Sequence, residues 1–461
     1  MKNKFDIIIK NAKIVDVNTH LLSDESVIIV DKGVIQKIGT MELLETSDAT
    51  RIWDAEEKLI LPGFINTHCH LFQTFMRGLG KDLTFIKWMN NSVRLMMPNL
   101  DEEAIYLAAM VGCMEAIKSG NTTLVDFMYA HVKPHYADYV LKAFDDCGIR
   151  GVLARGMTDV ERLPGSPVKP ASYATAADSL AEVDRSRGMY LDHPRISFAV
   201  APSVIWGMTA DGLKEIAAYA EIKGMIVTMH ILETVDDDQF SLDKYGKTTM
   251  RVLEDVGILD TDFLGVHAIR VSEDDLALFK KYQTRISYNP LANMILGSGV
   301  APIVDFTKHG INISLGTDGA ASNDSQNLIE VMKAGALLQK VHNHDSAALS
   351  AWEIFSMATD QGAACINMQD QIGSLTVGKK ADLIAVDFQK PNTTPSYDPI
   401  ASLVYSGNSE NIAMAMVEGE IIFDHCLFIK FDEKEILSRA QQKAEEIYRF
   451  SMEKNNFVRD V

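Results

Sequence analysis

Short apolar runs alternate with longer helical patterns between about residues 60 and 320. The apolar runs are rich in β-branched residues, which is typical of strands buried on both faces. Several of the helical segments begin at an acidic or hydroxyl residue and end at or near glycine, as capped helices do. We expect strands at 63–70, 122–127, 150–157, 195–203, 225–233, 262–269, 285–290 and 312–319.

Eight strands, each followed by helical sequence, predict an α/β fold with a (β/α)8 TIM-like barrel. The flanks at 5–59 and 373–424 instead carry short alternating runs broken at turn residues, and we expect them to pair into one small β-sandwich. The expected division is 1–59 and 373–430 for the two parts of the sandwich, 60–372 for the barrel, and 431–461 for an amphipathic C-terminal helix.

Composition narrows the range of partners. The chain has 461 residues and a net charge of −19, which argues against nucleic acid or an anionic membrane as a partner. No run approaches the roughly 20 apolar residues of a membrane span, and the first residues lack a signal cleavage site, so we expect a cytoplasmic protein. Five scattered cysteines without a CxxC pair indicate neither a disulfide framework nor a cysteine zinc site.

Histidines and acids gather where the predicted strands end. Catalytic residues of such barrels lie at the carboxyl ends of the strands, so side chains far apart in sequence meet at one mouth. A single histidine there is more often structural, and HxH alone is a weak pattern. Several such residues at the carboxyl ends of the predicted strands are harder to obtain by chance. The residues at these ends are His68, His70, His230, Glu233, His267 and Asp318.

Imidazole and carboxylate are preferred ligands of zinc and ferrous iron, and a catalytic metal keeps one position open for water. The predicted ligands are His68, His70, His230 and Asp318. His267 is then expected to orient the metal-bound hydroxide, while Glu233, three residues after a ligand, carries protons to the substrate.

Four motifs in this order carry a family resemblance: PGFINTHCH, TMHILE, GVHAI and SLGTDGAASND. With GSLTVGKKADLIAVD at 373–387, they make nearly the whole chain similar to the amidohydrolase superfamily, in its branch of mononuclear aminohydrolases. The resemblance implies the same four metal ligands and the same roles for Glu233 and His267. It also implies that Asp318 doubles as the proton acceptor.

The resemblance also bears on metal count and assembly. Dinuclear members of the superfamily carry a carboxylated lysine at the end of strand four, whereas RISFAVAPS has no lysine. We therefore expect one divalent metal per chain, zinc in preference to iron. Family members form dimers or higher assemblies, so a homo-oligomer is expected.

Two stretches offer substrate contacts. In the segment 70–89, Gln73 can pair with ring nitrogens, and Phe85 and Trp88 can stack on a flat ring or simply pack in the core. Arg155 is a candidate for an anion or ribose contact, with a barrel salt bridge as the alternative.

Later segments, NPLANMILGSGVAPIVDF and GTDGAASNDSQNL, are similar to triazine hydrolases such as atrazine chlorohydrolase and melamine deaminase, and to 8-oxoguanine deaminase. The resemblance places Asn293, Ser322, Asn323 and Asp324 around the pocket. The ASND portion equally fits a helix cap after the last strand.

The expected function is a metal-dependent hydrolytic deaminase of a small aromatic N-heterocycle: a purine, pyrimidine, pterin or s-triazine. Metal hydroxide attacks the ring carbon that bears the amine, and ammonia leaves. Dechlorination of s-triazines is one alternative. Deamination of S-adenosylhomocysteine or adenosine-type nucleosides is another, weakened because Ala201-Pro202-Ser203 replaces the Gly-Pro-His that S-adenosylhomocysteine deaminases carry. A cyclic amide hydrolase and a non-catalytic binding protein rank lower.

Overall fold

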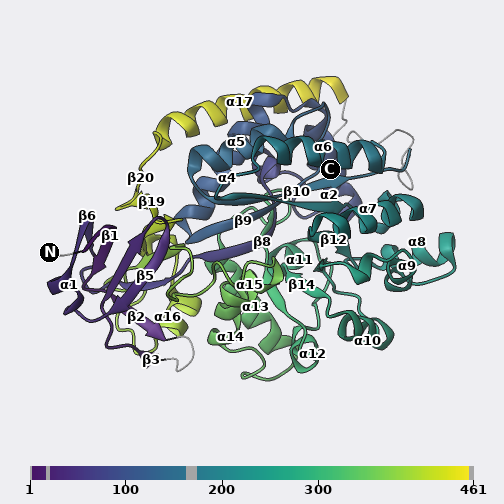
Figure 1. The fold of residues 1–461 in the computed structure, drawn as a ribbon. Coiled ribbons are helices and arrows are strands. Elements are labelled where there is room, and N and C mark those ends of the chain that lie inside the picture. Colours follow the sequence, from purple (N-terminus) through teal and green to yellow (C-terminus); the bar gives the residue numbers. More distant parts are fainter. Residues whose placement is uncertain (1–2, 17–20, 162–173, 456–461) are drawn as a thin grey trace.

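A computed structural model describes residues 3–16, 21–161 and 174–455 of the chain. Its centre is a closed barrel of parallel strands, surrounded by helices (Figure 1). All eight predicted strands are present, so the predicted barrel is confirmed. They are β8 (Phe64–His70), β9 (Asn121–Met128), β10 (Arg150–Met157), β11 (Ile196–Pro202), β12 (Val227–Ile231), β13 (Phe263–His267), β14 (Arg285–Tyr288) and β15 (Ile313–Leu315).

The barrel closes on its first strand. Each strand pairs with the next in chain order, and β15 returns to β8 through Leu315 and Asn66. A two-residue strand, β16 (Asp318–Gly319), also pairs with β8, opposite Cys69 and His70. The last residues of the barrel therefore lie beside the histidine pair of the first strand.

Helices follow the strands, and their ends carry the capping residues that the sequence suggested. Ser272 caps α10 (Glu273–Tyr282) in a capping box with Asp275, and Gly224 ends α7 (Ala210–Lys223) in the left-handed conformation. The other barrel helices are η1 (Leu71–Met76), α2 (Phe85–Asn91), α3 (Val93–Met96), η2 (Met97–Asn99), α4 (Glu102–Lys118), α5 (Ala137–Cys147), α6 (Ala176–Met189), η3 (Ile205–Gly207), α8 (Val235–Tyr245), α9 (Thr249–Asp255), η4 (Ile258–Asp260), α11 (Pro290–Ile295), α12 (Ile303–Lys308) and α13 (Leu328–His342).

Strands from both chain ends form two further sheets beside the barrel. One has the order β5-β4-β1-β6 and the other β20-β19-β18-β17-β7-β2-β3. Ile9 and Ile28 of the first sheet pack with Leu383 and Met414 of the second in one buried cluster, which confirms the predicted β-sandwich. The strands are β1 (Asn3–Lys10), β2 (Lys13–Asp16), β3 (Leu21–Leu22), β4 (Val27–Asp31), β5 (Val34–Gly39), β6 (Ser47–Asp54), β7 (Leu59–Pro62), β17 (Leu383–Val386), β18 (Ile412–Val417), β19 (Glu420–Asp424) and β20 (Leu427–Phe428).

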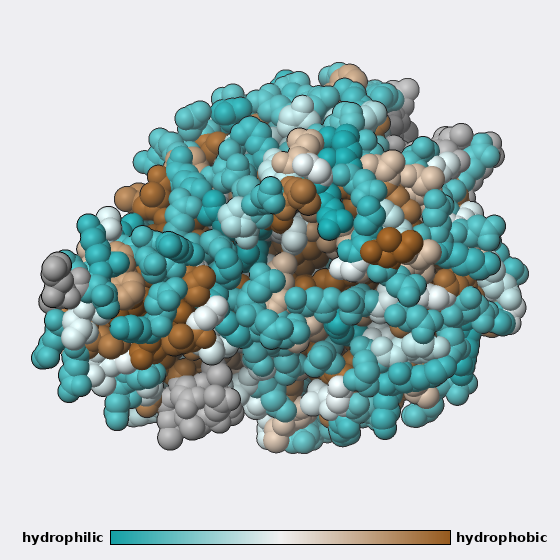
Figure 2. Space-filling view, in the orientation of Figure 1, coloured by the Kyte–Doolittle hydropathy of each residue, from teal (hydrophilic) through white to brown (hydrophobic). Residues whose placement is uncertain are grey.

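The C-terminal helix α17 (Glu433–Asn455) lies along α4 and α3, with Ile436, Ala440 and Ile447 buried (Figure 1). The remaining helices are α1 (Leu43–Thr46), α14 (Ala351–Met357), α15 (Asp360–Cys365), α16 (Pro399–Ser406) and η5 (Ser409–Asn411). Hydrophilic residues cover most of the face seen in Figure 2. None of the helices in the described ranges is long and apolar enough to cross a membrane.

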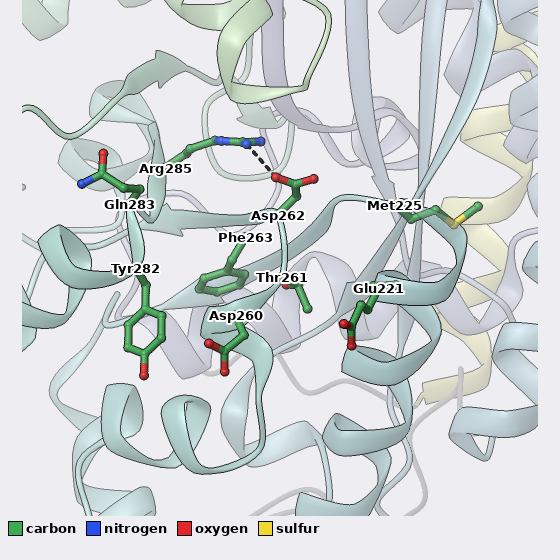
Figure 3. A pocket seen from close by; sticks show the side chains of 11 residues that line it. Glu221, Met225, Asp260, Thr261, Asp262, Phe263, Tyr282, Gln283 and Arg285 are labelled. Atoms are coloured by element: carbon green, nitrogen blue, oxygen red, sulfur yellow. Dashed lines mark hydrogen bonds and ion pairs between the residues drawn. The ribbon is translucent and has the colours of Figure 1, made fainter.

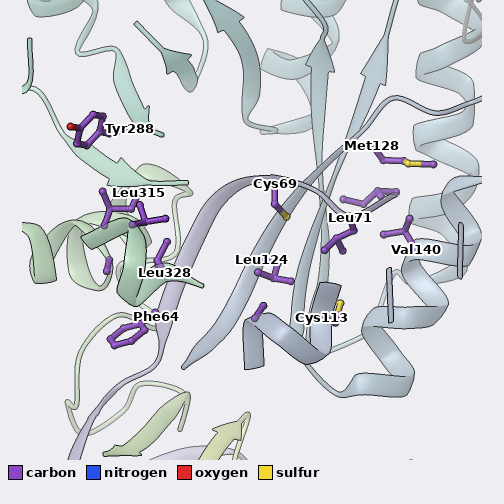
Figure 4. Packing of buried hydrophobic residues seen from close by; sticks show 14 of the residues in the cluster. Phe64, Cys69, Leu71, Cys113, Leu124, Met128, Val140, Tyr288, Leu315 and Leu328 are labelled. Carbon is purple, nitrogen blue, oxygen red and sulfur yellow. The ribbon is translucent and has the colours of Figure 1, made fainter. Parts of the chain in front are cut away.

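Apolar side chains fix β8 between its neighbours. Phe64, Cys69 and Leu71 belong to one buried cluster with Leu124 of β9 and Leu315 of β15 (Figure 4). All five are essentially inaccessible to solvent. The strand that carries His68 and His70 is thus held by apolar packing as well as by its backbone hydrogen bonds.

Candidate active site

Five of the six predicted catalytic and metal-binding side chains meet at the carboxyl ends of β8, β12, β13 and β16. Two sets of side chains each place their ligand atoms within 4.8 Å of one another. These sets are His68 with His230 and His267, and His68 with His70 and Asp318.

The orientation of two imidazoles is set by backbone carbonyls. His70 donates from Nδ1 to the carbonyl of Phe127 at 2.7 Å, and His230 donates from Nδ1 to the carbonyl of Ser203 at 2.8 Å. Because a carbonyl only accepts, each neutral ring keeps a lone pair on Nε2. These two Nε2 atoms lie 3.3 Å apart, so two hydrogen-bond acceptors face each other. A cation bound to both nitrogens would relieve the repulsion between their lone pairs.

His68 completes the arrangement. Neither of its ring nitrogens has a hydrogen-bond partner among the described residues, although the side chain is fully buried. Burial lowers its pKa to about 3, so the ring stays neutral and able to coordinate. Asp318 Oδ1 lies 3.4 Å from His68 Nε2 and 3.2 Å from His70 Nε2. Three imidazoles and one carboxylate of this kind fit a divalent metal.

Asp318 is held as a carboxylate. Burial alone would raise its pKa, but the contacts to His68 and His70 lower the pKa well below the ordinary value. Ser322 donates from Oγ to Asp318 Oδ2 at 2.8 Å, which fixes the second oxygen. Ser322, predicted to line the pocket, therefore lies against Asp318.

His267, the last residue of β13, and Glu233, two residues after the end of β12, face each other. His267 donates from Nδ1 to Asn293 Oδ1 at 2.9 Å, which leaves its Nε2 lone pair 3.6 Å from Glu233 Oε2. Burial raises the pKa of Glu233, and Ser298 donates to its Oε1 at 3.3 Å. The carboxyl is thus suited to hold a proton at higher pH than an exposed glutamate.

The backbone is strained where these side chains leave their strands. Leu232, His267, Ala268 and Asp318 have φ values of 49°, 73°, 47° and 62°, in the left-handed region that non-glycine residues rarely adopt. Strain of this kind gathers at functional sites, where surrounding contacts hold it.

The predicted substrate-contact residues of the segment 70–89 lie close to this mouth. Gln73 is buried, and its Nε2 donates to the hydroxyl of Tyr129 at 2.7 Å. Trp88 is also buried and donates from Nε1 to the carbonyl of Ala321 at 2.8 Å. Phe85 is partly exposed, with its ring centroid 5.6 Å from that of Trp88.

Arg155 lies buried at the end of β10 and donates from Nη1 to the carbonyl of Gly156 at 3.0 Å. It forms no ion pair with any residue the structure describes, so the structure does not show the salt bridge considered as its alternative role. Burial lowers its pKa to about 10. A buried guanidinium of this kind suits an anionic or hydroxyl-rich ligand group.

Asn323 and Asp324 hold loops. Asn323 donates from Nδ2 to the carbonyl of Thr317 at 2.8 Å. Asp324 accepts from the backbone N–H of Gly78 at 2.7 Å and pairs with Lys81 at 2.6 Å. The segment after β16 is therefore fastened to the segment after β8.

Sequence reasoning missed Tyr129, Ser203 and Ser298. Tyr129 follows β9 directly, so its position at a strand end was the available signal. Ser203 acts through its carbonyl, which any residue type supplies. Ser298 reaches Glu233 across 65 positions, which only the closed barrel reveals.

A separate pocket of about 410 Å³ opens at the amino-terminal ends of β12, β13 and β14, away from these histidines (Figure 3). Arg285 pairs there with Asp262 at 2.8 Å. None of the five side chains of the two candidate metal-binding sets lines this pocket.

Comparison with known proteins agrees with this geometry. The Amidohydrolase family matches residues 59–422. The chain belongs to the amidohydrolase family. Membership confirms the expectation of a hydrolase that acts on carbon–nitrogen bonds.

Amidohydrolases similar to this chain include a 5'-deoxyadenosine deaminase of Methanobrevibacter smithii, 33% identical, with 91% of this chain and 93% of the relative aligned. A 5-methylthioadenosine/S-adenosylhomocysteine deaminase of Carboxydothermus hydrogenoformans is 31% identical, with 96% and 98% aligned. The crystal structure of an adenosine deaminase from Xanthomonas campestris with bound zinc has a TM-score of 0.89 at 22% identity, covering 97% of this chain and 100% of that one.

Proposed function

We propose that this amidohydrolase is a metal-dependent deaminase of a small aromatic N-heterocycle. The observation that carries the proposal is the pair of Nε2 lone pairs of His70 and His230, which face each other at 3.3 Å beside the unpartnered ring of His68. A buried set of acceptors turned toward one point suits a cation, and Asp318 supplies the negative charge.

The residues that would hold the metal are His68, His70, His230 and Asp318. A bound divalent cation lowers the pKa of water toward neutrality and so supplies a nucleophile. We propose zinc, because three imidazoles and one carboxylate suit it, with iron as the second candidate. One metal per chain would also count against a dinuclear cyclic amide hydrolase.

The remaining groups move protons. His267, fixed by Asn293, orients the attacking water with its free Nε2. Glu233 gives its proton to the ring nitrogen beside the amine-bearing carbon, which makes that carbon more electrophilic. Asp318 would take the proton of the attacking water and pass it to the amine, which leaves as ammonia. The remaining hydroxyl proton of the adduct returns to Glu233 as the carbonyl forms.

Substrate choice within this class combines two observations. The relatives in the comparison act, by name, on adenosine derivatives, which favours an adenine ring. Arg155 forms no ion pair with any residue in the described ranges and could contact a ribose or an anionic group. Ser203 stands where S-adenosylhomocysteine deaminases carry a histidine, and its hydroxyl lies 3.0 Å from Thr158 Oγ1, so any ribose would be held differently.

The test is ammonia release from metal-loaded protein offered 5'-deoxyadenosine, S-adenosylhomocysteine, guanine, 8-oxoguanine, cytosine, isoxanthopterin and melamine. Asp318→Asn is the inactive control. Release from one ring type that is absent in the control supports the proposal and names the ring. Chloride release from chloro-triazines without ammonia from any amine would favour the dechlorinase alternative instead.

A homo-oligomer and a cytoplasmic location stay predictions of the sequence. Gel filtration with light scattering would measure the first, and cell fractionation the second.

A further inference from the structure

Tyr129 follows β9, and its ring lies at the same mouth of the barrel as the candidate metal ligands. The ring packs edge-on against His70, at a centroid distance of 5.0 Å, and against Phe72, at 4.8 Å. A tyrosine hydroxyl offers one O–H donor, and part of the Tyr129 side chain stays exposed.

The hydrogen bond from Gln73 leaves the Tyr129 proton without an acceptor. Gln73 Nε2 donates to the Tyr129 oxygen at 2.7 Å, so the oxygen accepts and its own O–H is free to donate. No acceptor for this proton is found in the described part of the chain. The Gln73 amide packs against the backbone of β16, because a Cβ on Gly319 would stand only 1.8 Å from its Oε1.

The backbone of Tyr129 is fixed as well. A Cβ on Gly156 would lie 2.5 Å from the Cβ of Tyr129, so the end of β10 approaches this residue as closely as glycine allows. His131 donates from Nε2 to the carbonyl of Met128 at 2.8 Å, which closes the turn around Tyr129. The hydroxyl is thus positioned before any substrate arrives.

We infer that the Tyr129 hydroxyl donates a hydrogen bond to a second ring nitrogen of the substrate, other than the one that Glu233 protonates. Gln73 is then a positioning residue that acts through Tyr129. A ring nitrogen is the fitting acceptor because purines, pyrimidines, pterins and s-triazines all offer one. The inference rests on the proposed function and adds a determinant of specificity to it.

The first test compares kinetics of metal-loaded wild type, Tyr129→Phe and Tyr106→Phe on 5'-deoxyadenosine and guanine. Tyr106 donates to Asp146 outside the barrel mouth and is the matched control. A bond to a ring nitrogen forms in both ground and transition states, so Tyr129→Phe should raise KM roughly tenfold with kcat within about twofold. Tyr106→Phe should leave both unchanged.

The second test uses analogues in which one ring nitrogen is replaced by C–H, such as the 3-deaza and 7-deaza forms of each purine. The analogue that lacks the accepting nitrogen should have the same KM with wild type and Tyr129→Phe. Gln73→Glu keeps the hydroxyl but offers it a carboxylate acceptor, so its KM should rise as in Tyr129→Phe.

Two results would overturn the inference without affecting the proposed deaminase activity. One is a wild-type KM for Tyr129→Phe, and the other is an equal rise in the KM of Tyr129→Phe with every analogue. If wild type deaminates no ring in the wider panel, the proposed function fails and the inference falls with it.

Discussion

Glu233 is the residue whose protonation should be visible in a rate profile. Burial raises its pKa, so it keeps its proton to higher pH than an exposed glutamate. Because the protonated form is the acid in the proposed mechanism, kcat/KM should decline as pH rises through this raised pKa. Glu233→Gln should lower kcat by about 10²- to 10⁴-fold and remove that limb of the profile.

The control for this measurement is Glu221→Gln, at the opposite end of the barrel. It should keep the wild-type profile. An unchanged high-pH limb in Glu233→Gln would assign the titration to another group.

Single residues also show how far sequence reasoning reaches. The metal-ligand candidates could be predicted because strand ends and residue types are both readable along the chain. Asn293 and Ser322 were placed around the pocket, but whether each faces a ligand or another side chain depends on packing. In the structure they contact His267 and Asp318.

Two loops join across the barrel mouth through Asp324. It accepts from Gly78 and pairs with Lys81, and the Lys81 ammonium also donates to the carbonyl of Ala321 at 2.8 Å. The same carbonyl accepts from Trp88. Helix α2, which carries Trp88, is therefore positioned by the loop that follows β16.

Asp324→Ala should release the loop after β8 and raise KM roughly tenfold, since misplaced contact residues weaken binding and orientation. Stability should change by less than about 1 kcal/mol, because the ion pair is partly exposed. Steady-state kinetics and urea unfolding measure the two effects. The control is Asp255→Ala, which removes an exposed ion pair with Lys247 and should alter neither KM nor stability. A wild-type KM for Asp324→Ala would show that the loop after β8 is held without Asp324.

At the level of elements, strands were easier to predict than connections. Alternation and β-branched runs mark each strand locally, whereas β16 exists because it pairs with β8 across the closed barrel. Contacts such as the one between Asp324 and Gly78 join residues 246 positions apart and leave no local pattern.

Across the whole molecule, a buried ion cluster joins barrel and sandwich. Arg150, at the start of β10, binds Asp382 at 2.7 Å and 3.0 Å and Glu418 at 2.6 Å. The Arg150 and Asp382 side chains are 3% and 2% exposed, so water compensates neither charge. The cluster lies at the end of the barrel away from the histidines.

Arg150→Met should therefore lower the free energy of unfolding by about 3–5 kcal/mol, because it leaves the buried carboxylate of Asp382 without an ion-pair partner, although Glu418 keeps its pair with Lys380. Urea unfolding is the measurement. Arg251→Met, which removes an exposed pair with Glu254, is the control and should leave the free energy of unfolding nearly unchanged. An equal, small loss in both variants would show that apolar packing alone joins the two parts.

The closure of the barrel on β8 has a consequence for synthesis. Asn66 and its partner Thr317 are 251 positions apart, and β8 gains its second neighbour only when β15 and β16 have been made. At about 5–20 residues per second, the first barrel strand waits roughly 10–50 seconds with one edge unpaired. Such an edge is open to pairing with other chains. During synthesis, the strand that carries His68 and His70 is therefore the one with an unpaired edge. Chains arrested before residue 313 should be tested for chaperone binding.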